Sequence, residues 1–442
     1  MKQLTPLLLT LLLTACYVVE APPGEGGLGT VVTPTWQPSP QPTWQPSPSP
    51  TWQPSPSPTW QPSPSPSWQP SPSPNLNPCL QQWCGQGTAH DPLQVHSLQQ
   101  LHDLRFELTN PNRPKPLHVR QMRDINAQSS NFWHSGLGFL PLGQALNGTS
   151  QSSALVYDGN HHRISQLRIH APEHNQVGLF AQLEQAKITN LHLTQVNIQG
   201  RDQVGAIAGS CRTANGCQLE NTSVSGQVRG RDYVGGLVGG GLSDQVAISK
   251  SSSAAELNGQ TNVGGLVGSL FSGGIADSHS TSNVQGWDNI GGLVGYSHAL
   301  IERSYSIGRI SLGQNSAGAA GGLVGVINNG GISDSYFRGQ VSGPGFTGGL
   351  IGYNYQGATA YSYVAGSVSK QSTVSGPIAG SSYDSLSFSL FWDTQVTGHS
   401  TSTIGTGLPS ARMKERASFS HWDFTRVWNI STVQNQGYPF LR

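Results

Sequence analysis

Aliphatic residues and glycines recur along the chain with a period of about 28 residues between positions 177 and 380. Eight related segments, variants of Val-Gly-Gly-Leu-Val-Gly, follow one another at intervals of 27, 30, 29, 27, 30, 27 and 28 residues. They begin at Val177, Val204, Val234, Val263, Ile290, Ala320, Thr347 and Ser375. A fixed period in this range is typical of stacked structural units that each contact only their neighbours. The pattern therefore predicts a repeat architecture.

Each unit contains a second recurring segment. An aliphatic or threonine position recurs at Ile248, Ile275, Ile301, Ile332 and Thr359. A serine follows three residues later, at Ser251, Ser278, Ser304, Ser335 and Ser362, and an aliphatic residue nine residues later, at Leu257, Val284, Ile310, Val341 and Val368. Positions that recur once per turn stack about 4.8 Å apart in parallel strands, where serines can hydrogen-bond along their own column. We predict an all-β parallel β-solenoid (β-helix), with glycines at corners that need positive φ or close backbone approach.

Other repeat architectures fit less well. A propeller blade needs about 40 residues, a leucine-rich repeat needs a leucine framework, and collagen needs glycine at every third position. We predict an N-terminal cap over 79–155 with a short helical segment within 93–106, repeats over 156–385, and a C-terminal cap over 386–442. In the latter we expect a short helix over 409–417, and Trp422, Trp428 and Tyr438 covering the last turn.

The N-terminal part of the chain has a different composition. Of the 30 prolines, 19 lie in 22–78, and the octapeptide Thr-Trp-Gln-Pro-Ser-Pro-Ser-Pro repeats five times between Thr35 and Pro74 with minor changes. Alternating proline excludes helix and sheet, so residues 17–78 are predicted to form a disordered, extended polyproline II stalk. We favour a spacer. Glycosylation of its Ser and Thr residues and binding to aromatic grooves or peptidoglycan through its tryptophans are the alternatives.

Residues 1–16 have the features of a secretory signal: Lys2, an apolar run over 7–13, and Leu-Thr-Ala-Cys at the end. This ending resembles the lipobox of bacterial lipoproteins, in which the cysteine becomes the first mature residue and carries the lipid. The resemblance implies that Cys16 anchors the protein to a membrane, and Tyr17, where inner-membrane lipoproteins often have Asp, favours the outer membrane. The alternative is an ordinary signal peptide with an incidental cysteine.

Four cysteines remain after Cys16, namely Cys79, Cys84, Cys211 and Cys217. An even number in a secreted chain indicates disulfides, and the short spacings favour local pairs, Cys79–Cys84 and Cys211–Cys217. A zinc site is the weaker alternative because neither pair has the two-residue spacing of a zinc knuckle. We expect the second pair to staple an enlarged turn of the solenoid.

The composition argues against several functions. Charged residues make up 10% of the chain and the net charge is +1, which excludes the basic surface of a nucleic-acid-binding protein. No His-Glu-x-x-His sequence is present, and the histidines, which concentrate between His90 and His192, lack metal-ligand spacing. Asp202, Asp232 and Asp288 precede the repeated strand, where turn formation is the simplest role. We expect no catalytic residues, no metal and no cofactor.

Three tyrosines occupy equivalent positions in consecutive turns, Tyr305, Tyr336 and Tyr363. Such a column either stacks without a ligand or forms a platform that binds sugar or protein, since aromatic residues are favoured at interfaces. We treat this column as the candidate binding site.

The Gly-Gly-Leu-Val-Gly units and the Ser-Tyr pairs at 304–305, 335–336 and 362–363 resemble the GLUG motif repeats of bacterial surface adhesins. These repeats also occur in the non-catalytic N-terminal regions of IgA-specific metallopeptidases. The segment Tyr-Asp-Gly-Asn-His-His-Arg-Ile at 157–164 and the ending Tyr-Pro-Phe-Leu at 438–441 extend the resemblance over about 93–442. It implies a β-helical surface module for adhesion or surface interaction.

We therefore expect a lipid-anchored cell-surface protein whose solenoid binds an unidentified surface glycan or protein without catalysis. A carbohydrate-active β-helix enzyme, either a polysaccharide lyase or a hydrolase, is one alternative, which rests on analogy of fold. A structural envelope protein without a soluble ligand is the other.

Overall fold

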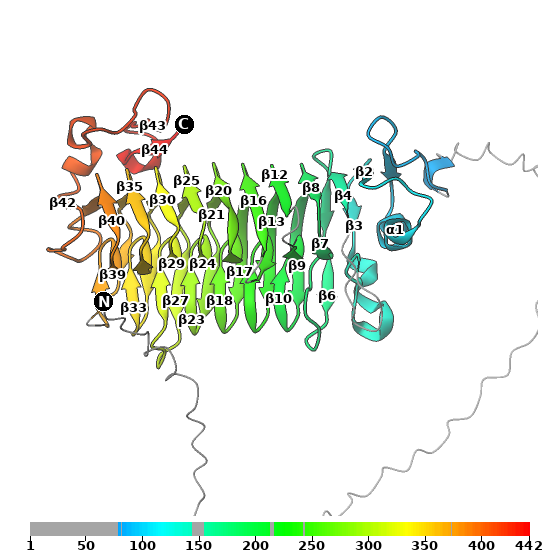
Figure 1. Ribbon diagram of the computed structural model, residues 1–442, viewed down its shortest axis with the longest axis horizontal. Coiled ribbons are helices and arrows are strands. Elements are labelled where there is room, and N and C mark those ends of the chain that lie inside the picture. The colour runs from blue at the N-terminus through cyan, green and yellow to red at the C-terminus, as the bar shows by residue number, and fades with distance from the viewer. Residues whose placement is uncertain (1–77, 81, 144–153, 213–215, 242–243, 373) are drawn as a thin grey trace, which may run out of the picture. The chain divides into compact units, whose positions relative to one another are not determined.

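The computed structural model describes residues 78–80, 82–143, 154–212, 216–241, 244–372 and 374–442. The predicted signal peptide with Cys16, and the predicted stalk up to residue 77, lie outside the described residues. Within the described part the chain is an all-β parallel β-solenoid, as predicted, and its turns stack side by side along one axis (Figure 1).

Four parallel sheets run along the solenoid, and a complete turn contributes to each of them. Sheet I has 11 strands: β1 (Leu93–Val95), β2 (Leu117–Gln121), β4 (Leu155–Asp158), β8 (Ala186–Thr189), β12 (Cys217–Glu220), β16 (Gln245–Ser249), β20 (Ser272–Ala276), β25 (Leu300–Glu302), β30 (Gly331–Ser333), β35 (Ala358–Ala360) and β40 (Leu386–Phe388). Sheet II has 16: β3 (Ile125–Asn126), β5 (Arg163–Ser165), β6 (Arg168–His170), β9 (His192–Gln199), β13 (Ser223–Arg229), β17 (Ser252–Asn258), β21 (His279–Ser280), β22 (Asn283–Gly286), β26 (Tyr305–Ser306), β27 (Arg309–Leu312), β31 (Tyr336–Phe337), β32 (Gln340–Ser342), β36 (Tyr363–Val364), β37 (Ser367–Val368), β41 (Phe391–Asp393) and β42 (Thr406–Leu408).

The other two sheets carry the glycine-rich motif. Sheet III has seven strands: β10 (Asp202–Gly205), β14 (Asp232–Gly235), β18 (Thr261–Gly264), β23 (Asp288–Gly291), β28 (Ala319–Gly321), β33 (Phe346–Gly348) and β38 (Ser375–Gly376). Sheet IV has eight: β7 (Phe180–Leu183), β11 (Ala208–Cys211), β15 (Val238–Gly240), β19 (Val267–Leu270), β24 (Val294–Ser297), β29 (Val324–Asn328), β34 (Ile351–Tyr355) and β39 (Ala379–Tyr383).

The predicted columns of side chains are in register. Ile248, Ile275, Ile301 and Ile332 pair successively in sheet I, and the aliphatic residues from Leu257 to Val368 pair in sheet II. All of them are buried, and burying one such side chain stabilises a fold by about 1.5–3 kcal/mol. The core is therefore a set of columns that the sequence period defines.

The glycine-rich motif forms a bend rather than a single strand. In the turn that contains Val234, β14 ends at Gly235 and β15 begins at Val238, so Gly236 and Leu237 connect sheets III and IV. A Cβ atom at Gly236 would lie 2.2 Å from the carbonyl oxygen of Gly265 in the next turn. The second glycine of the motif is therefore required because successive bends approach each other too closely for a side chain.

The expectation that glycines occupy the positive-φ corners is wrong at the corner between sheets I and II. Lys250, Asp277, Arg303, Asp334 and Tyr361 adopt φ between 43° and 50° there. Each immediately precedes a buried serine of the predicted column, whose hydroxyl donates to the carbonyl oxygen two residues before it at 2.7–2.8 Å. The serine hydroxyl oxygen also accepts a hydrogen bond from the backbone N–H of the equivalent serine in the preceding turn, at 3.1–3.2 Å. These two bonds satisfy the backbone at the corner and offset the cost of the left-handed conformation.

The N-terminal cap is shorter than predicted. β1, β2 and β3 already pair in sheets I and II, so the solenoid begins within the region expected to be a cap. The helix α1 (Leu98–Thr109), predicted within 93–106, starts at the N-cap Ser97 and buries Leu101, Leu104 and Leu108. Three short 3-10 turns accompany it: η1 (Pro78–Leu80), η2 (Gln128–Phe132) and η3 (His134–Gly136).

The C-terminal cap also begins later than predicted, because β40, β41 and β42 extend the sheets to Leu408. The expected helix over 409–417 is replaced by two 3-10 turns, η4 (Arg412–Lys414) and η5 (Arg416–Ser418). A third turn, η6 (Asn435–Gly437), and the antiparallel pair β43 (Trp428–Asn429) and β44 (Phe440–Leu441) complete the segment. The chain after Leu408 folds back toward preceding turns instead of covering only the last one (Figure 1).

Candidate functional site

The three predicted tyrosines form a continuous stack on the outer side of sheet II. The ring centroids of Tyr305 and Tyr336 are 4.7 Å apart with an interplanar angle of 4°, and those of Tyr336 and Tyr363 are 5.1 Å apart at 11°. His279 extends the stack by one turn, 4.8 Å from Tyr305. We refer to these four side chains as the sheet II column.

The C-terminal segment covers most of this column. Tyr363 is fully buried and Tyr336 is 5% exposed, because Trp428 and Tyr438 pack against them. The Tyr363 hydroxyl donates to the carbonyl oxygen of Pro439 at 2.7 Å and accepts from Asn435 Nδ2 at 2.9 Å, and burial raises its pKa well above the usual value. A binding platform at Tyr336 and Tyr363 is therefore incorrect for this structure, and the alternative of stacking without a ligand describes them. Tyr305 remains partly exposed.

A groove lies on the outer side of sheet I, where no functional residue was predicted. Its floor is formed by small residues that flank Ile248 and Ile275, namely Ala247, Ser249, Gly274 and Ala276. Larger residues on the neighbouring strands β12 and β25 form its walls, including Gln218, Glu220, Leu300 and Glu302. The groove has a volume of about 410 Å³ and extends across the four neighbouring strands from β12 to β25. The signal for it in the sequence was the small residue on each side of the repeated isoleucine.

The two carboxylates of the groove are not arranged for hydrolysis. Glu220 and Glu302 lie three strands apart, which corresponds to about 14 Å at the usual strand spacing. Paired carboxyl groups of glycosidases are about 5–10 Å apart. Both also have basic partners: Glu220 lies 3.7 Å from Lys187 and 3.6 Å from Lys250, and Glu302 lies 2.7 Å from Arg303. The separation and the ion pairs of these two carboxylates therefore differ from those of a glycosidase pair.

Asp202 and Asp232 are in register on neighbouring strands of sheet III, where stacked acids would be close enough for hydrolysis. Arg231 lies between them. Its guanidinium bonds to both carboxylate oxygens of Asp202 at 2.9 and 2.7 Å and lies 3.1 Å from Asp232. At Asp202 the expected turn role is replaced by an ion pair with Arg231 of the next turn. The same guanidinium lies beside its neighbour Asp232, and it offsets the repulsion between the two stacked carboxylates.

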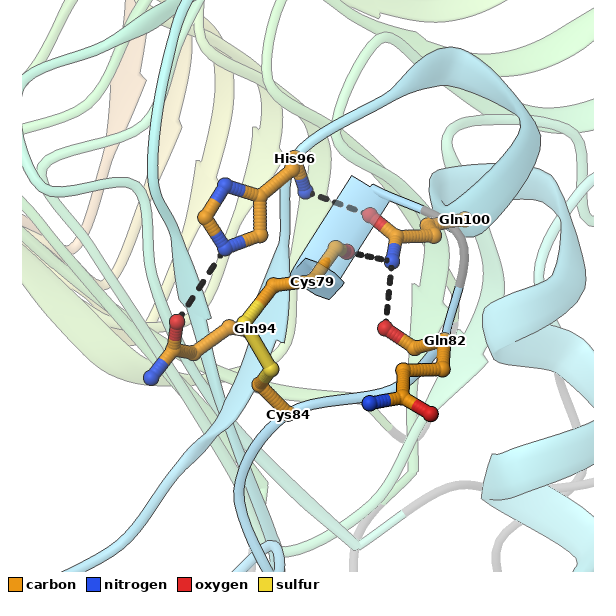
Figure 2. The surroundings of a disulfide bond; sticks show 6 residues. All are labelled: Cys79, Gln82, Cys84, Gln94, His96 and Gln100. Atoms are coloured by element: carbon orange, nitrogen blue, oxygen red, sulfur yellow. Dashed lines mark hydrogen bonds between the residues drawn. A yellow bond between two sulfur atoms is a disulfide. The ribbon is translucent and has the colours of Figure 1, made fainter. Parts of the chain in front are cut away.

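Both predicted disulfides are formed, and each closes a short loop of the chain. Cys79–Cys84 closes a loop next to α1, where Gln100 Nε2 donates to the carbonyl oxygens of Cys79 at 2.6 Å and Gln82 at 3.3 Å, and Gln100 Oε1 accepts from the backbone of His96 (Figure 2). The buried side-chain amide of Gln100 therefore connects the disulfide loop to the start of α1.

The second disulfide, Cys211–Cys217, joins the end of β11 to the start of β12 and staples the enlarged turn as expected. The backbone N–H of Cys211 donates to the buried Asp244 carboxylate at 2.8 Å. Burial raises the pKa of Asp244 to about 6. In the part of the chain that the structure describes, no group of three or more His, Cys, Asp or Glu side chains is arranged to hold a metal. Among the same residues, no helix has the length and apolarity that a membrane span requires.

Comparison with known proteins identifies the repeat. Residues 152–226 match the family model described as the M26 IgA1-specific metallo-endopeptidase N-terminal region. The predicted family resemblance is confirmed. The chain is 32% identical over 176 residues to halomucin of Haloquadratum walsbyi, which is 39% of this chain and 2% of halomucin. It is also 32% identical over 169 residues to an immunoglobulin A1 protease of Streptococcus sanguinis, which is 37% of this chain and 8% of the protease.

A solved structure of a candidate immunoglobulin A1 protease from Bacteroides ovatus aligns with 81% of this chain and 94% of its own, with a TM-score of 0.46 and 16% identity. This chain matches only a small fraction of the length of the first two relatives. The confirmed likeness therefore concerns a small part of these longer proteins, and the family model that matches describes an N-terminal region.

Proposed function

We propose that this protein is a lipid-anchored protein of the cell envelope that presents its solenoid for adhesion or another surface interaction and catalyses no reaction. The groove on sheet I carries the proposal. It offers an uncovered hollow bounded by larger side chains, and its two carboxylates are widely separated and paired with basic groups. Such a hollow suits a ligand that rests against the small side chains of its floor.

Two further observations support the proposal. The chain is similar to parts of halomucin, of an immunoglobulin A1 protease and of a protein named as a Gly-rich membrane protein, which favours a place in the cell envelope. The signal-like residues 1–16 and the proline-rich residues 17–78 would provide an anchor at Cys16 and a spacer between membrane and solenoid. Replacement of Cys16 by Ala should release the protein from the membrane fraction, and unchanged fractionation would refute the anchor.

The groove can be tested with a matched pair of variants. Ala247 and Ala358 occupy the same outward column of sheet I, and both are exposed, but only Ala247 lies in the groove. The full chain and the variants Ala247→Trp and Ala358→Trp are incubated with a panel of glycans and host matrix proteins, and bound material and reaction products are both measured. We expect saturable binding without products, at least a tenfold loss in Ala247→Trp, and no loss in Ala358→Trp. Product formation, or equal binding by both variants, contradicts the proposal.

A further inference from the structure

A second set of aromatic side chains lies on the outer side of sheet IV, in the same part of the solenoid as the sheet II column. Tyr296, Val326 and Tyr353 are in register on β24, β29 and β34. Two residues further along the strands, Asn328, Tyr355 and Tyr383 are in register on β29, β34 and β39. These six side chains, the sheet IV strip, form two parallel rows that point away from the core.

The protein's own chain holds the strip in place without covering it. Asn328 Nδ2 donates to the Tyr296 hydroxyl at 2.9 Å, and the ring of Phe346 packs beside Tyr353 at 5.3 Å. Tyr355 and Tyr383 stack with ring centroids 5.5 Å apart. Tyr383 nevertheless remains 59% exposed, and the other five side chains are partly exposed. Side chains that are ordered before a ligand arrives lose little conformational entropy on binding.

The strip carries no charge. Within the described residues, none of the eight strands of sheet IV contains Asp, Glu, Lys or Arg. What the strip offers instead is aromatic rings together with phenol hydroxyls and an amide. The faces of aromatic rings attract the polarised C–H groups of a pyranose, and the hydroxyls and the amide can exchange hydrogen bonds with sugar hydroxyls. An uncharged surface also matches a ligand that has no charge.

From this chemistry we infer that the sheet IV strip binds an uncharged oligosaccharide through Tyr296, Tyr353, Tyr355 and Tyr383. The size of the strip favours a sugar over a protein as its ligand. From Tyr296 to Tyr383 it crosses three strand spacings, about 14 Å, and its two rows are about 7 Å apart. A stable protein interface needs about 800 Å² on each partner. The strip is much smaller than this, but it accommodates a few linked sugar rings.

This inference rests on the proposed function as a binding protein, but it concerns a different face from the groove. The test uses the full chain and measures binding of cellohexaose, chitohexaose and maltohexaose as neutral probes and of hexagalacturonic acid as the anionic probe. The variants Tyr353→Ala and Tyr355→Ala remove rings of the strip. Phe132→Ala, which removes an exposed ring of the N-terminal cap, is the matched control. The thermal midpoint of each variant verifies that it is folded.

We expect saturable binding of at least one neutral probe, with an at least tenfold loss in each tyrosine variant and none in Phe132→Ala. Binding should change little between about 0.05 and 0.5 M NaCl, because no charged group takes part. Three results overturn the inference: no neutral probe binds, the tyrosine variants bind as well as the wild type, or only the anionic probe binds. Ala247→Trp separates the two proposals, since it should impair only ligands of the groove.

Discussion

Two groups of aromatic side chains in the same turns of the solenoid have opposite environments. In the sheet II column, the chain's own C-terminal segment buries Tyr336 and Tyr363 under Trp428 and Tyr438. In the sheet IV strip, Tyr383 stays 59% exposed, and its neighbours are partly exposed. Repetition of an aromatic residue in successive turns is therefore insufficient to identify a binding surface. What distinguishes the two is whether another part of the same chain covers the rings.

The largest expected effect is a loss of stability where the C-terminal segment covers the sheet II column. Trp428 has no exposed surface, and its indole N–H donates to Asp334 Oδ1 at 3.1 Å. We predict that Trp428→Ala destabilises the packing of the C-terminal segment by about 3–5 kcal/mol, since it removes a large buried side chain. Limited proteolysis and chemical denaturation measure the effect. A variant with wild-type resistance to cleavage after Leu408 would show that this segment does not cover the column.

A smaller effect is expected when only the hydroxyl of the column is removed. Tyr363→Phe keeps the stacked ring but removes the hydroxyl that donates to the Pro439 carbonyl and accepts from Asn435 Nδ2, while the Asn435 amide still donates to that carbonyl at 2.6 Å. We predict a loss of about 0.5–1.5 kcal/mol in the free energy of unfolding, the net contribution of a typical intramolecular hydrogen bond. Tyr305→Phe, in the partly exposed ring of the same column, serves as the control and should be close to neutral. Chemical denaturation measures both variants. Equal losses in the free energy of unfolding of Tyr363→Phe and Tyr305→Phe would contradict the difference in burial between the two tyrosines.

The smallest effect is expected on the open strip. Tyr383 lies on the last strand of sheet IV and is mostly exposed. Its ring stacks on that of Tyr355. Tyr383→Ala should therefore change the free energy of unfolding by no more than about 0.5 kcal/mol. Thermal or chemical denaturation checks this value. A loss similar to that of Trp428→Ala would mean that the strip has a structural role and that its exposure does not reflect ligand binding.

The sequence period predicted the features that repeat in every turn. The isoleucine column from Ile248 to Ile332 and the buried serines occur where their spacing placed them. Positive-φ corners were predicted at glycines, and the corner between sheets I and II was missed because residues such as Lys250 and Arg303 are not typical of that conformation. It is the hydrogen bonds of the neighbouring serines that stabilise it there.

The candidate binding surfaces were not predicted for a different reason. The cover on the sheet II column depends on contacts between residues far apart in sequence, such as Asp334 and Trp428, which no local pattern reveals. The groove depends on which small residues become neighbours in register, such as Ala247 and Gly274. The sheet IV strip combines residues that recur only in some turns, so a search for identical positions passes over it.

Hydroxyl-radical footprinting of the full chain, read by mass spectrometry, tests the central contrast most directly, because oxidation of an aromatic side chain reports its exposure to solvent. We predict rapid oxidation of Tyr383 and slow oxidation of Tyr336, Tyr363 and Trp428. A bound oligosaccharide should protect Tyr296, Tyr353, Tyr355 and Tyr383 of the sheet IV strip from oxidation. Oxidation of Tyr336 and Tyr363 as fast as that of Tyr383 would contradict the claim that the chain covers one aromatic column and leaves the other open for a ligand.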